Sequence, residues 1–296
     1  QFAILNATIS SIEAATDQPS KFRVEFDFTY TPEDPNKIIE YDRIIACTGF
    51  RYIDLSMFDQ DTVPVQVDPR PNLKGKFPLI TETWQYAGVP NMYALGAIMQ
   101  TVNYRKNAGG FIHGFRYSIR SLIEIIFSTE YGVPLRSSEV PSVESLKDEV
   151  IRRINSASSF YQMYGELCDV AVLDEATDFG FKYYYDLPIS FARSQFSGLN
   201  YFILTFKVYP NPDDQDSFKY VPAATPSTPE MSVFIHPVLK FCDSSGRESE
   251  ELHLLENIDI HWSDPDLHVK PVSDYLSRHI DSLCNPPASK EVICLT

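Results

Sequence analysis

The sequence predicts an α/β fold, in which a small β-meander, a closing strand and a long helix precede an α+β accessory domain. Three observations lead to this prediction. Apolar side chains alternate along residues 22–30, as they do in a strand with one buried face. One apolar run, at residues 43–51, is broken by Thr48-Gly49, and a second, at residues 91–96, ends at Gly96. The second run leads into a stripe of apolar residues with helical spacing at residues 109–127.

The first 50 residues alternate between strand patterns and turn residues. Proline, Asp and Asn favour turns between strands. The expected strands are residues 2–12, 22–30 and 37–40, and the expected turns are residues 16–20 and 31–36. A buried strand at residues 43–47 is expected to follow, which would make Cys47 an inert thiol of the interior.

The middle of the chain is expected to carry an irregular excursion, a strand and a helix. Residues 56–90 are rich in proline and are typical of a long surface segment between two strands. A buried strand is predicted to end at Gly96, and a helix is predicted over residues 109–127. The apolar stripe of this helix is Phe111, Ile112, Phe115, Ile119, Leu122, Ile123 and Ile126.

A stretch rich in Ser and Pro at residues 137–145 is predicted to be a linker. We therefore expect two domains, residues 1–137 and residues 138–296. In the second domain, helical spacing begins at Ser142 and resumes after a serine-rich break. The other expected elements are strands at residues 168–174, 200–209, 233–241 and 252–262, and a helix at residues 272–283.

Composition limits the classes of partner. The formal net charge is -15, which argues against binding to nucleic acid or to an anionic membrane. No apolar run approaches the roughly 20 residues that cross a bilayer. The five cysteines include no C-x-x-C spacing, although Cys284 and Cys294 could bridge a short loop. The chain starts at Gln1 without a signal peptide, and we expect it to be a fragment or a processed chain.

The first glycine crossing contains Thr48 and Gly49. A strand that ends beside a flat or charged ligand needs a small residue, a hydroxyl and a glycine, because glycine lets the backbone approach closely. An ordinary strand that ends in a Thr-Gly turn explains the same pattern. The spacing alone leaves both interpretations open.

The second crossing combines Gly96, a basic loop and a helix that starts with glycines. Free N–H groups and the positive end of the helix dipole would meet at Gly109 and Gly110 and could stabilise a phosphate or the edge of a reduced flavin. Arg105 and Lys106 would add positive potential. A solvated basic turn before a core helix is the alternative.

No catalytic residue or metal site is identified by the sequence. His113 is expected to be a structural histidine, and no pair of histidines has the i, i+4 spacing of a metal site. Neither a G-x-S-x-G elbow nor a phosphate-binding loop is present.

Several motifs resemble those of known flavoproteins. The run ACTGFR resembles a crossover motif of the flavoproteins with two dinucleotide-binding domains, such as flavin-containing monooxygenases and thioredoxin reductases. The runs YRKNAGGFIHGFRY, RRINSASSFYQMYGELCDV and FIHPVLKF resemble the endoplasmic-reticulum flavoproteins associated with degradation. This resemblance implies part of a flavoprotein with two dinucleotide-binding domains. Residues 1–137 would be the C-terminal part of its FAD- and NAD(P)-binding oxidoreductase domain, and residues 138–296 an accessory α+β domain that could bind partners.

The resemblance also implies a cofactor position. FAD would lie against Thr48-Gly49 and against the loop at Gly96-Ala97. Its isoalloxazine ring would face the helix that opens at Gly109-Gly110-Phe111. The sequence departs from the wider class in two places, since it contains no G-x-G-x-x-G and has Ala97 where many relatives have an Asp. The isolated chain is therefore expected to be inactive.

The function implied by the resemblance is that of an FAD-dependent oxidoreductase of the endoplasmic-reticulum lumen. It would pass electrons from NAD(P)H through the flavin to a disulfide or another acceptor, in the degradation of misfolded glycoproteins. Quality-control and degradation proteins of that compartment would be its partners. Two alternatives are a non-catalytic module that recruits degradation partners and a flavin-dependent monooxygenase acting on nitrogen or sulfur.

Overall fold

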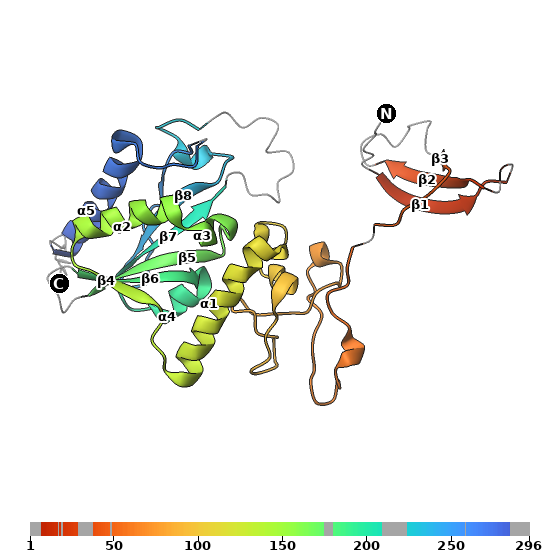
Figure 1. Cartoon of the computed structure of the whole chain (residues 1–296), viewed down its shortest axis with the longest axis horizontal. Coiled ribbons are helices and arrows are strands. Elements are labelled where there is room, and N and C mark those ends of the chain that lie inside the picture. The colour runs from red at the N-terminus through yellow and green to blue at the C-terminus, as the bar shows by residue number, and fades with distance from the viewer. Residues whose placement is uncertain are drawn as a thin grey trace, which may run out of the picture. The chain divides into compact units, whose positions relative to one another are not determined.

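The computed structural model describes residues 7–16, 18, 20–28, 38–47, 49–174, 180–208, 224–257 and 259–284. The chain divides into two compact units, Gln1–Phe50 and Arg51–Thr296, and each is described by itself. Sheets and helices both occur (Figure 1), so the α/β class predicted from the sequence is confirmed.

The first unit is a three-stranded antiparallel meander in the order β1-β2-β3. Its strands are β1 (Ala7–Ala14), β2 (Phe22–Phe28) and β3 (Ile38–Tyr41). The predicted alternation is confirmed in β2, where Val24 and Phe26 are buried and the residues between them are exposed. The turn predicted at residues 31–36 lies outside the described residues.

The strand predicted at residues 43–47 is wrong. These residues form no strand, Ile45 is 85% exposed and the thiol of Cys47 is exposed rather than buried. An apolar run becomes a strand only where a neighbouring strand completes its hydrogen bonds. In the described part of this unit, the pairing ends with β3.

The second unit begins with the irregular excursion that the prolines predicted. It contains short 3-10 turns, η1 (Leu55–Met57) and η2 (Pro71–Leu73), and isolated bridges such as Ile80↔Tyr86. Trp84 anchors the excursion, because its side chain is fully buried in the main core of this unit.

The buried strand predicted to end at Gly96 is also wrong. Only one bridge, Gln85↔Tyr93, forms there, and the backbone N–H of Ala94 donates to the carbonyl of Trp84 at 2.8 Å. The segment therefore folds back onto its own excursion instead of joining a sheet. A 3-10 turn, η3 (Gly96–Thr101), follows directly.

The long helix is confirmed as α1 (Ile112–Tyr131), preceded by the 3-10 turn η4 (Ala108–Gly110). Gly132 ends the helix in a left-handed conformation, with φ of 66°. The predicted stripe is buried only in part. Leu122 packs in the core, whereas Phe111, Ile112 and Ile123 are exposed.

A six-stranded antiparallel sheet forms the body of the second unit, in the order β4-β6-β5-β7-β8-β9 (Figure 1). Its strands are β4 (Ser137–Val140), β5 (Leu167–Asp174), β6 (Gly180–Pro188), β7 (Tyr201–Lys207), β8 (His236–Cys242) and β9 (Leu252–His253). The strands predicted near residues 168–174, 200–209 and 233–241 are confirmed. Of the strand predicted at residues 252–262, only the two residues of β9 form a strand.

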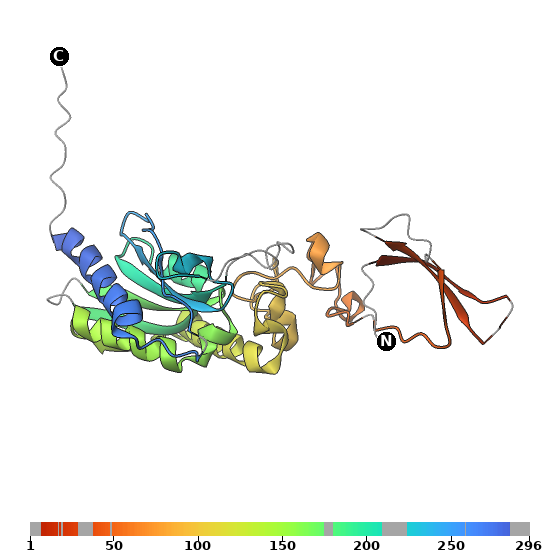
Figure 2. The ribbon, with the colours of Figure 1, turned by 90° about the horizontal axis from the view of Figure 1, so that it is seen from above.

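Helices cover both faces of this sheet. The helices are α2 (Val143–Ser156), α3 (Ser158–Gln162), α4 (Ile189–Gln195) and α5 (Lys270–Cys284), which follows a π-turn at Pro265–Val269. The main core joins α1, α2, α3 and α5 to one face of the sheet, and a smaller core joins α4 to the other (Figures 1 and 2). In β7, Phe202 faces the first core and Ile203 the second, as strand periodicity requires.

Residues 137–145, predicted to be a linker, are built into the sheet instead. Ser137–Val140 is β4, and the hydroxyl of Ser138 lies 2.6 Å from that of Tyr185. The hydroxyl of Ser142 caps α2 by accepting from the N–H of Ser145 at 3.1 Å. The boundary expected at residues 137–138 thus lies within the second compact unit, and the assignment of two functional domains stays a prediction.

No helix among the described residues has both the length and the apolar character needed to cross a bilayer. β6 and α4 had no counterpart among the elements expected from the sequence. β6 lies between β4 and β5 in the sheet, and α4 covers the face of the smaller core.

Candidate functional site

The residues expected to bind a cofactor are divided between the two units. Thr48 lies outside the described residues. Gly49 belongs to the first unit and has φ of 72°, so it occupies the left-handed conformation that favours glycine. The others lie in the second unit, and they are Gly96, Ala97, Arg105, Lys106, Gly109, Gly110 and Phe111.

Gly96 and the glycine pair before α1 have different physical roles. Gly96 has φ of 82°, and a Cβ added there would meet no atom within 4 Å, so its surroundings are open. A Cβ on Gly110 would lie 2.6 Å from Oε1 of Gln100, and one on Gly109 would lie 3.0 Å from Oδ1 of Asn107. Gly109 and Gly110 therefore allow the chain to pack on itself. They leave no cradle for a phosphate.

The start of α1 is open to solvent. Phe111 is the N-cap and makes no capping hydrogen bond with its side chain. Phe111 is 64% exposed and Ile112 is 72% exposed. His113, expected to be structural, is also exposed, and its ring stacks on Phe111 with centroids 5.5 Å apart. Flat apolar surface beside the positive end of a helix dipole suits the edge of a planar, electron-rich ring.

The basic loop before α1 is held in an unusual conformation. Arg105 is exposed and has φ of 60°, and its guanidinium lies 5.1 Å from the ring centroid of Tyr104. A left-handed conformation is uncommon for a residue with a long side chain, and the surrounding structure must hold it in place.

A buried carboxylate supplies that hold. Glu166 directly precedes β5 and is 4% exposed. Its oxygens accept hydrogen bonds from Asn103 Nδ2 at 3.3 Å, Asn107 Nδ2 at 3.0 Å and Ser118 Oγ at 3.2 Å. The carboxylate thereby ties the loop and α1 to the sheet, and we call this arrangement the Glu166 clamp.

Burial raises the pKa of Glu166, and the hydrogen bonds from Asn107, Asn103 and Ser118 act in the opposite direction. The buried indole of Trp84 also lowers this pKa, although its Nε1–H completes no hydrogen bond of normal geometry. Because the three bonded groups donate, the ionised carboxylate satisfies them best. The sequence offered no signal for Glu166, since it is a single acidic residue outside every motif.

A cleft of about 790 Å³ borders the Glu166 clamp within the second unit. Its volume is in the range of small-molecule sites. Glu166, Arg70 and Arg193 contribute to its walls. Both arginines are already paired, Arg70 with Asp68 at 2.9 Å and Arg193 with Glu248 at 2.8 Å. The positive charges of these two arginines are therefore already paired with carboxylates of the chain.

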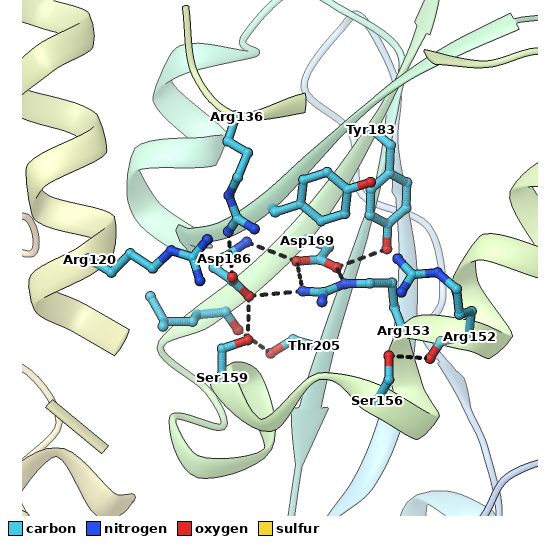
Figure 3. A network of polar contacts seen from close by, with 12 residues as sticks. Arg120, Arg136, Arg152, Arg153, Ser156, Ser159, Asp169, Tyr183, Asp186 and Thr205 are labelled. Atoms are coloured by element: carbon cyan, nitrogen blue, oxygen red, sulfur yellow. Dashed lines mark hydrogen bonds and ion pairs between the residues drawn. The ribbon is translucent and has the colours of Figure 1, made fainter. Parts of the chain in front are cut away.

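A second buried polar cluster lies inside the sheet layer (Figure 3). Arg153 of α2 donates to Asp169 of β5 at 3.0 Å and to Asp186 of β6 at 2.9 Å. Tyr183 donates to Asp169 at 3.0 Å, and Arg136 pairs with Asp186 at 2.6 Å. Tyr183 and Asp186 both belong to β6, so this cluster joins α2 to β5 and β6.

The charges in this cluster depend on one another. Burial opposes the charge of Arg153, but the hydrogen bond to Asp169 and the charges of Asp169 and Asp186 together outweigh burial and raise the arginine pKa. Burial raises the pKa of Asp169 despite Arg153. For Asp186, burial is outweighed by Ser159, Arg153 and Arg136, and its pKa is lowered. This cluster is a structural ion network, and its residues line no part of the cleft.

A histidine pair lies at the β8–β9 edge. His236 is 1% exposed, its Nδ1 lies 2.9 Å from the carbonyl of Phe234, and its Nε2 lies 2.8 Å from Nδ1 of His253. Nε2 of His253 lies 3.2 Å from Oε2 of Glu251. A carbonyl and a carboxylate only accept, so all contacts are satisfied when the two rings share three protons. Burial lowers the pKa of His236, consistent with its being the neutral ring.

Glu251 is expected to make stability at this edge depend on acid. The hydrogen bond from His253 is the largest cause that lowers its pKa below 4.5, and Lys207 and Lys240 add to it. A carboxyl group with a depressed folded-state pKa stabilises the fold above pH 4.5, and this contribution is lost as the pH falls below that value. Glu251→Gln is expected to cost about 1–3 kcal/mol at neutral pH.

Urea denaturation between neutral pH and pH 3 checks this expectation. The Glu251→Gln variant should lose less stability than the unsubstituted protein over the acidic part of that range. Its exposed neighbour gives a matched control, because Glu250→Gln should leave the pH profile unchanged. Parallel acid profiles for Glu251→Gln and the unsubstituted protein would contradict the assignment.

No group of three metal-ligating side chains that could hold an ion occurs in the described part of the chain.

Comparison with known proteins gives one consistent result. No family model and no solved structure matches the chain. Curated proteins do match it: the mouse relative is 28% identical over 94% of this chain. The chain resembles FAD-dependent oxidoreductase domain-containing protein 2. The resemblance expected from the motifs is thereby confirmed.

The match to FAD-dependent oxidoreductase domain-containing protein 2 covers most of this chain but only part of the relatives. The alignment includes 47% of the mouse protein, and with the zebrafish protein it has 28% identity over 80% of this chain and 36% of the relative. The chain spans about half the length of the mouse relative. The name of these relatives indicates an FAD-dependent oxidoreductase domain.

Proposed function

We propose that this chain is the C-terminal part of an FAD-dependent oxidoreductase with two dinucleotide-binding domains. The observation that supports this most is the 28% identity with FAD-dependent oxidoreductase domain-containing protein 2 over 94% of the chain. The open start of α1, with exposed Phe111 beside the helix dipole, is compatible with a flavin ring.

In this proposal the chain's residues bind and orient the cofactor. The open backbone at Gly96 would approach FAD, and Phe111 would cover one part of its ring. The cofactor contact of Thr48-Gly49 stays a prediction from the sequence. Arg105 and Lys106 would supply positive potential, while Gly109 and Gly110 shape the turn that precedes α1. FAD itself would carry the redox chemistry, by accepting a hydride from NAD(P)H and passing electrons to a disulfide or another acceptor.

The fit of the described residues to FAD is partial. The start of α1 suits a ring, but the glycine pair is filled by Gln100 and Asn107 and gives no phosphate cradle. The sequence also contains no G-x-G-x-x-G. Binding of the adenosine diphosphate half is therefore assigned to other parts of a full-length protein. We expect the isolated chain to be inactive.

The wider role follows from the resemblance. We propose action in the endoplasmic-reticulum lumen, with degradation proteins and misfolded glycoproteins as partners. A flavin-dependent monooxygenase acting on nitrogen or sulfur is an alternative use of the same ring site. A second candidate from another class is a non-catalytic recruiting module. It is favoured by the smaller core between α4 and the sheet, whose buried residues all lie between positions 135 and 242.

Flavin binding by the full-length protein tests the proposal. The purified full-length protein is expected to show flavin absorbance or to take up added FAD, and anaerobic NAD(P)H should bleach that absorbance. A protein that stays colourless and takes up no FAD would contradict the proposal. NADPH-dependent formation of peroxide or oxygenated product would instead favour the monooxygenase.

Gly96→Ala is expected to weaken FAD binding about fivefold or more, since a strained backbone costs about 1 kcal/mol or more and the added methyl group enters the open space. Gly88→Ala is the matched control, because Gly88 also has a positive φ and nothing near its Cβ position. Titration of FAD into both full-length variants, followed by flavin fluorescence, measures the difference. Equal affinities would remove Gly96 from the site.

A further inference from the structure

We propose that Glu166 is a positioning residue, whose buried carboxylate sets the conformation of residues 103–111 and so the geometry at the start of α1. The role of that geometry in holding a flavin rests on the proposed function. The hold of Glu166 on the loop does not, because it follows from hydrogen bonds within the chain.

The Glu166 clamp joins parts of the chain that are remote in sequence. Asn103, Asn107 and Ser118 lie 63, 59 and 48 residues before Glu166. Covalent neighbours therefore cannot place the carboxylate, and only folding of the six-stranded sheet brings it to the loop. At 4% exposure, Glu166 has little access to water that could replace these donors.

The hydrogen bonds of Asn107 require a hydrogen-bond acceptor at position 166. Its Oδ1 accepts from the N–H of Gly109 at 2.9 Å, and its Nδ2 donates to Glu166 at 3.0 Å and to the carbonyl of Tyr164 at 3.4 Å. The amide cannot turn over without losing the bond to Gly109. Only an acceptor at position 166 completes this arrangement.

The conformation of the loop passes directly into α1. The N–H of Phe111 donates to Ala108 at 3.0 Å, and the N–H of Gly114 donates to Phe111 at 2.9 Å. A Cβ on Gly114 would lie 2.1 Å from the carbonyl oxygen of Ala108, so the first turn of α1 packs directly on η4. A change at Asn107 therefore displaces the residues that would face the ring.

One consequence concerns the organisation of the protein. The site residues at 96–111 lie before residue 137. The carboxylate that positions them is that of Glu166, which lies after residue 137 and directly before strand β5 of the sheet. The accessory domain is then a structural part of the site rather than a separable attachment.

Reciprocal exchange of donor and acceptor tests the positioning role. Glu166→Leu removes both acceptor oxygens that the three donors use, and Asn107→Asp sets two carboxyl groups against each other. Each single change is expected to speed backbone hydrogen exchange in residues 103–111 about tenfold or more. In the double variant Glu166→Gln with Asn107→Asp, the new amide can donate to the new carboxylate. This restores one donor–acceptor pair with reversed direction, and exchange should return to within about threefold of the unsubstituted protein.

The control is Asp169→Asn, which alters a fully buried carboxylate of β5, the strand that begins directly after Glu166. Asp169 bonds to Arg153 rather than to the loop. It should leave exchange in residues 103–111 within about twofold of the unsubstituted protein under native conditions. Unchanged exchange in both single variants, or a double variant as fast as the singles, overturns the hold of Glu166 on the loop.

The flavin arm uses the full-length protein with the same four variants and FAD as the probe. Both single variants should shift the flavin absorption spectrum and reduction potential, and the double variant should reverse the shift. A loosened loop with an unchanged spectrum, potential and FAD affinity overturns positioning of the flavin. If the unsubstituted protein takes up no FAD, the proposed function and the flavin role fail together. The exchange data then still decide whether Glu166 holds the loop.

Discussion

Replacing Arg153 with leucine is expected to lower the free energy of unfolding by about 3–5 kcal/mol. Arg153 is 9% exposed and is bonded to both Asp169 and Asp186. Its removal leaves two buried carboxylates with one fewer cation, and Asp169 is fully buried. The cost therefore arises from uncompensated charge in the interior rather than from the loss of attraction alone.

The adjacent arginine provides a matched control on the same helix. Arg152, labelled in Figure 3, has a side chain that is 55% exposed, and it pairs with Glu149. Arg152→Leu should cost no more than about 1 kcal/mol, because exposed ion pairs contribute little. Urea denaturation of both variants at neutral pH makes the comparison. Equal losses would show that the network around Arg153 does not carry the expected charge penalty.

Replacing Trp84 with alanine is expected to cost about 3–5 kcal/mol and to release the excursion from the sheet. The indole is fully buried, yet it comes from a segment with few regular hydrogen bonds. Its backbone is tied to Thr81 at 3.0 Å and to Ala94 at 2.8 Å. Loss of the side chain should therefore expose residues 79–94 to protease as well as lower stability.

Trp84→Phe separates packing from the indole N–H. Trp84 has φ of 60°, so phenylalanine and alanine carry the same backbone cost at this position. The phenylalanine variant should lose only about 1–2 kcal/mol, because most of the apolar volume remains. Denaturation curves and limited proteolysis of the two variants test this. Similar cleavage of both would mean that the side chain does not anchor the excursion.

The periodicity of apolar residues correctly predicted the elements whose burial pattern is contained in their own sequence. The alternation in β2, the helical stripe of α1 and the apolar run of β5 were recognisable because burial repeats at the period of each element. The bounds of α5 agreed within two residues at its start. These elements needed no knowledge of their neighbours.

The same reasoning failed where an apolar run had no strand beside it. Residues 43–47 and 91–95 both end before a glycine and both lack a regular strand. A strand is stabilised by hydrogen bonds to another strand, and periodicity does not show whether that partner exists. The serines of residues 137–145 led to the opposite error, because they predicted a linker where the structure has regular elements. Ser138 lies in β4 and bonds to Tyr185, and Ser142 caps α2.

The candidate site shows the same division. Glycines and basic residues before α1 were found from their spacing, although Gly109 and Gly110 prove to serve internal packing. Glu166 was missed, because its importance depends on three donors from another part of the chain. A single acidic residue before a strand has no distinguishing pattern.

By itself, the sequence determined the class of fold, the position of α1 and the resemblance to FAD-dependent oxidoreductase domain-containing protein 2, which comparison with the mouse and zebrafish proteins bears out. These features depend on residue types at short spacing. Tertiary structure alone decided that Glu166 holds the loop before α1 and that Arg153 joins two strands. Such contacts unite residues between 16 and 63 positions apart, and the free energy of a buried charge depends on which groups surround it.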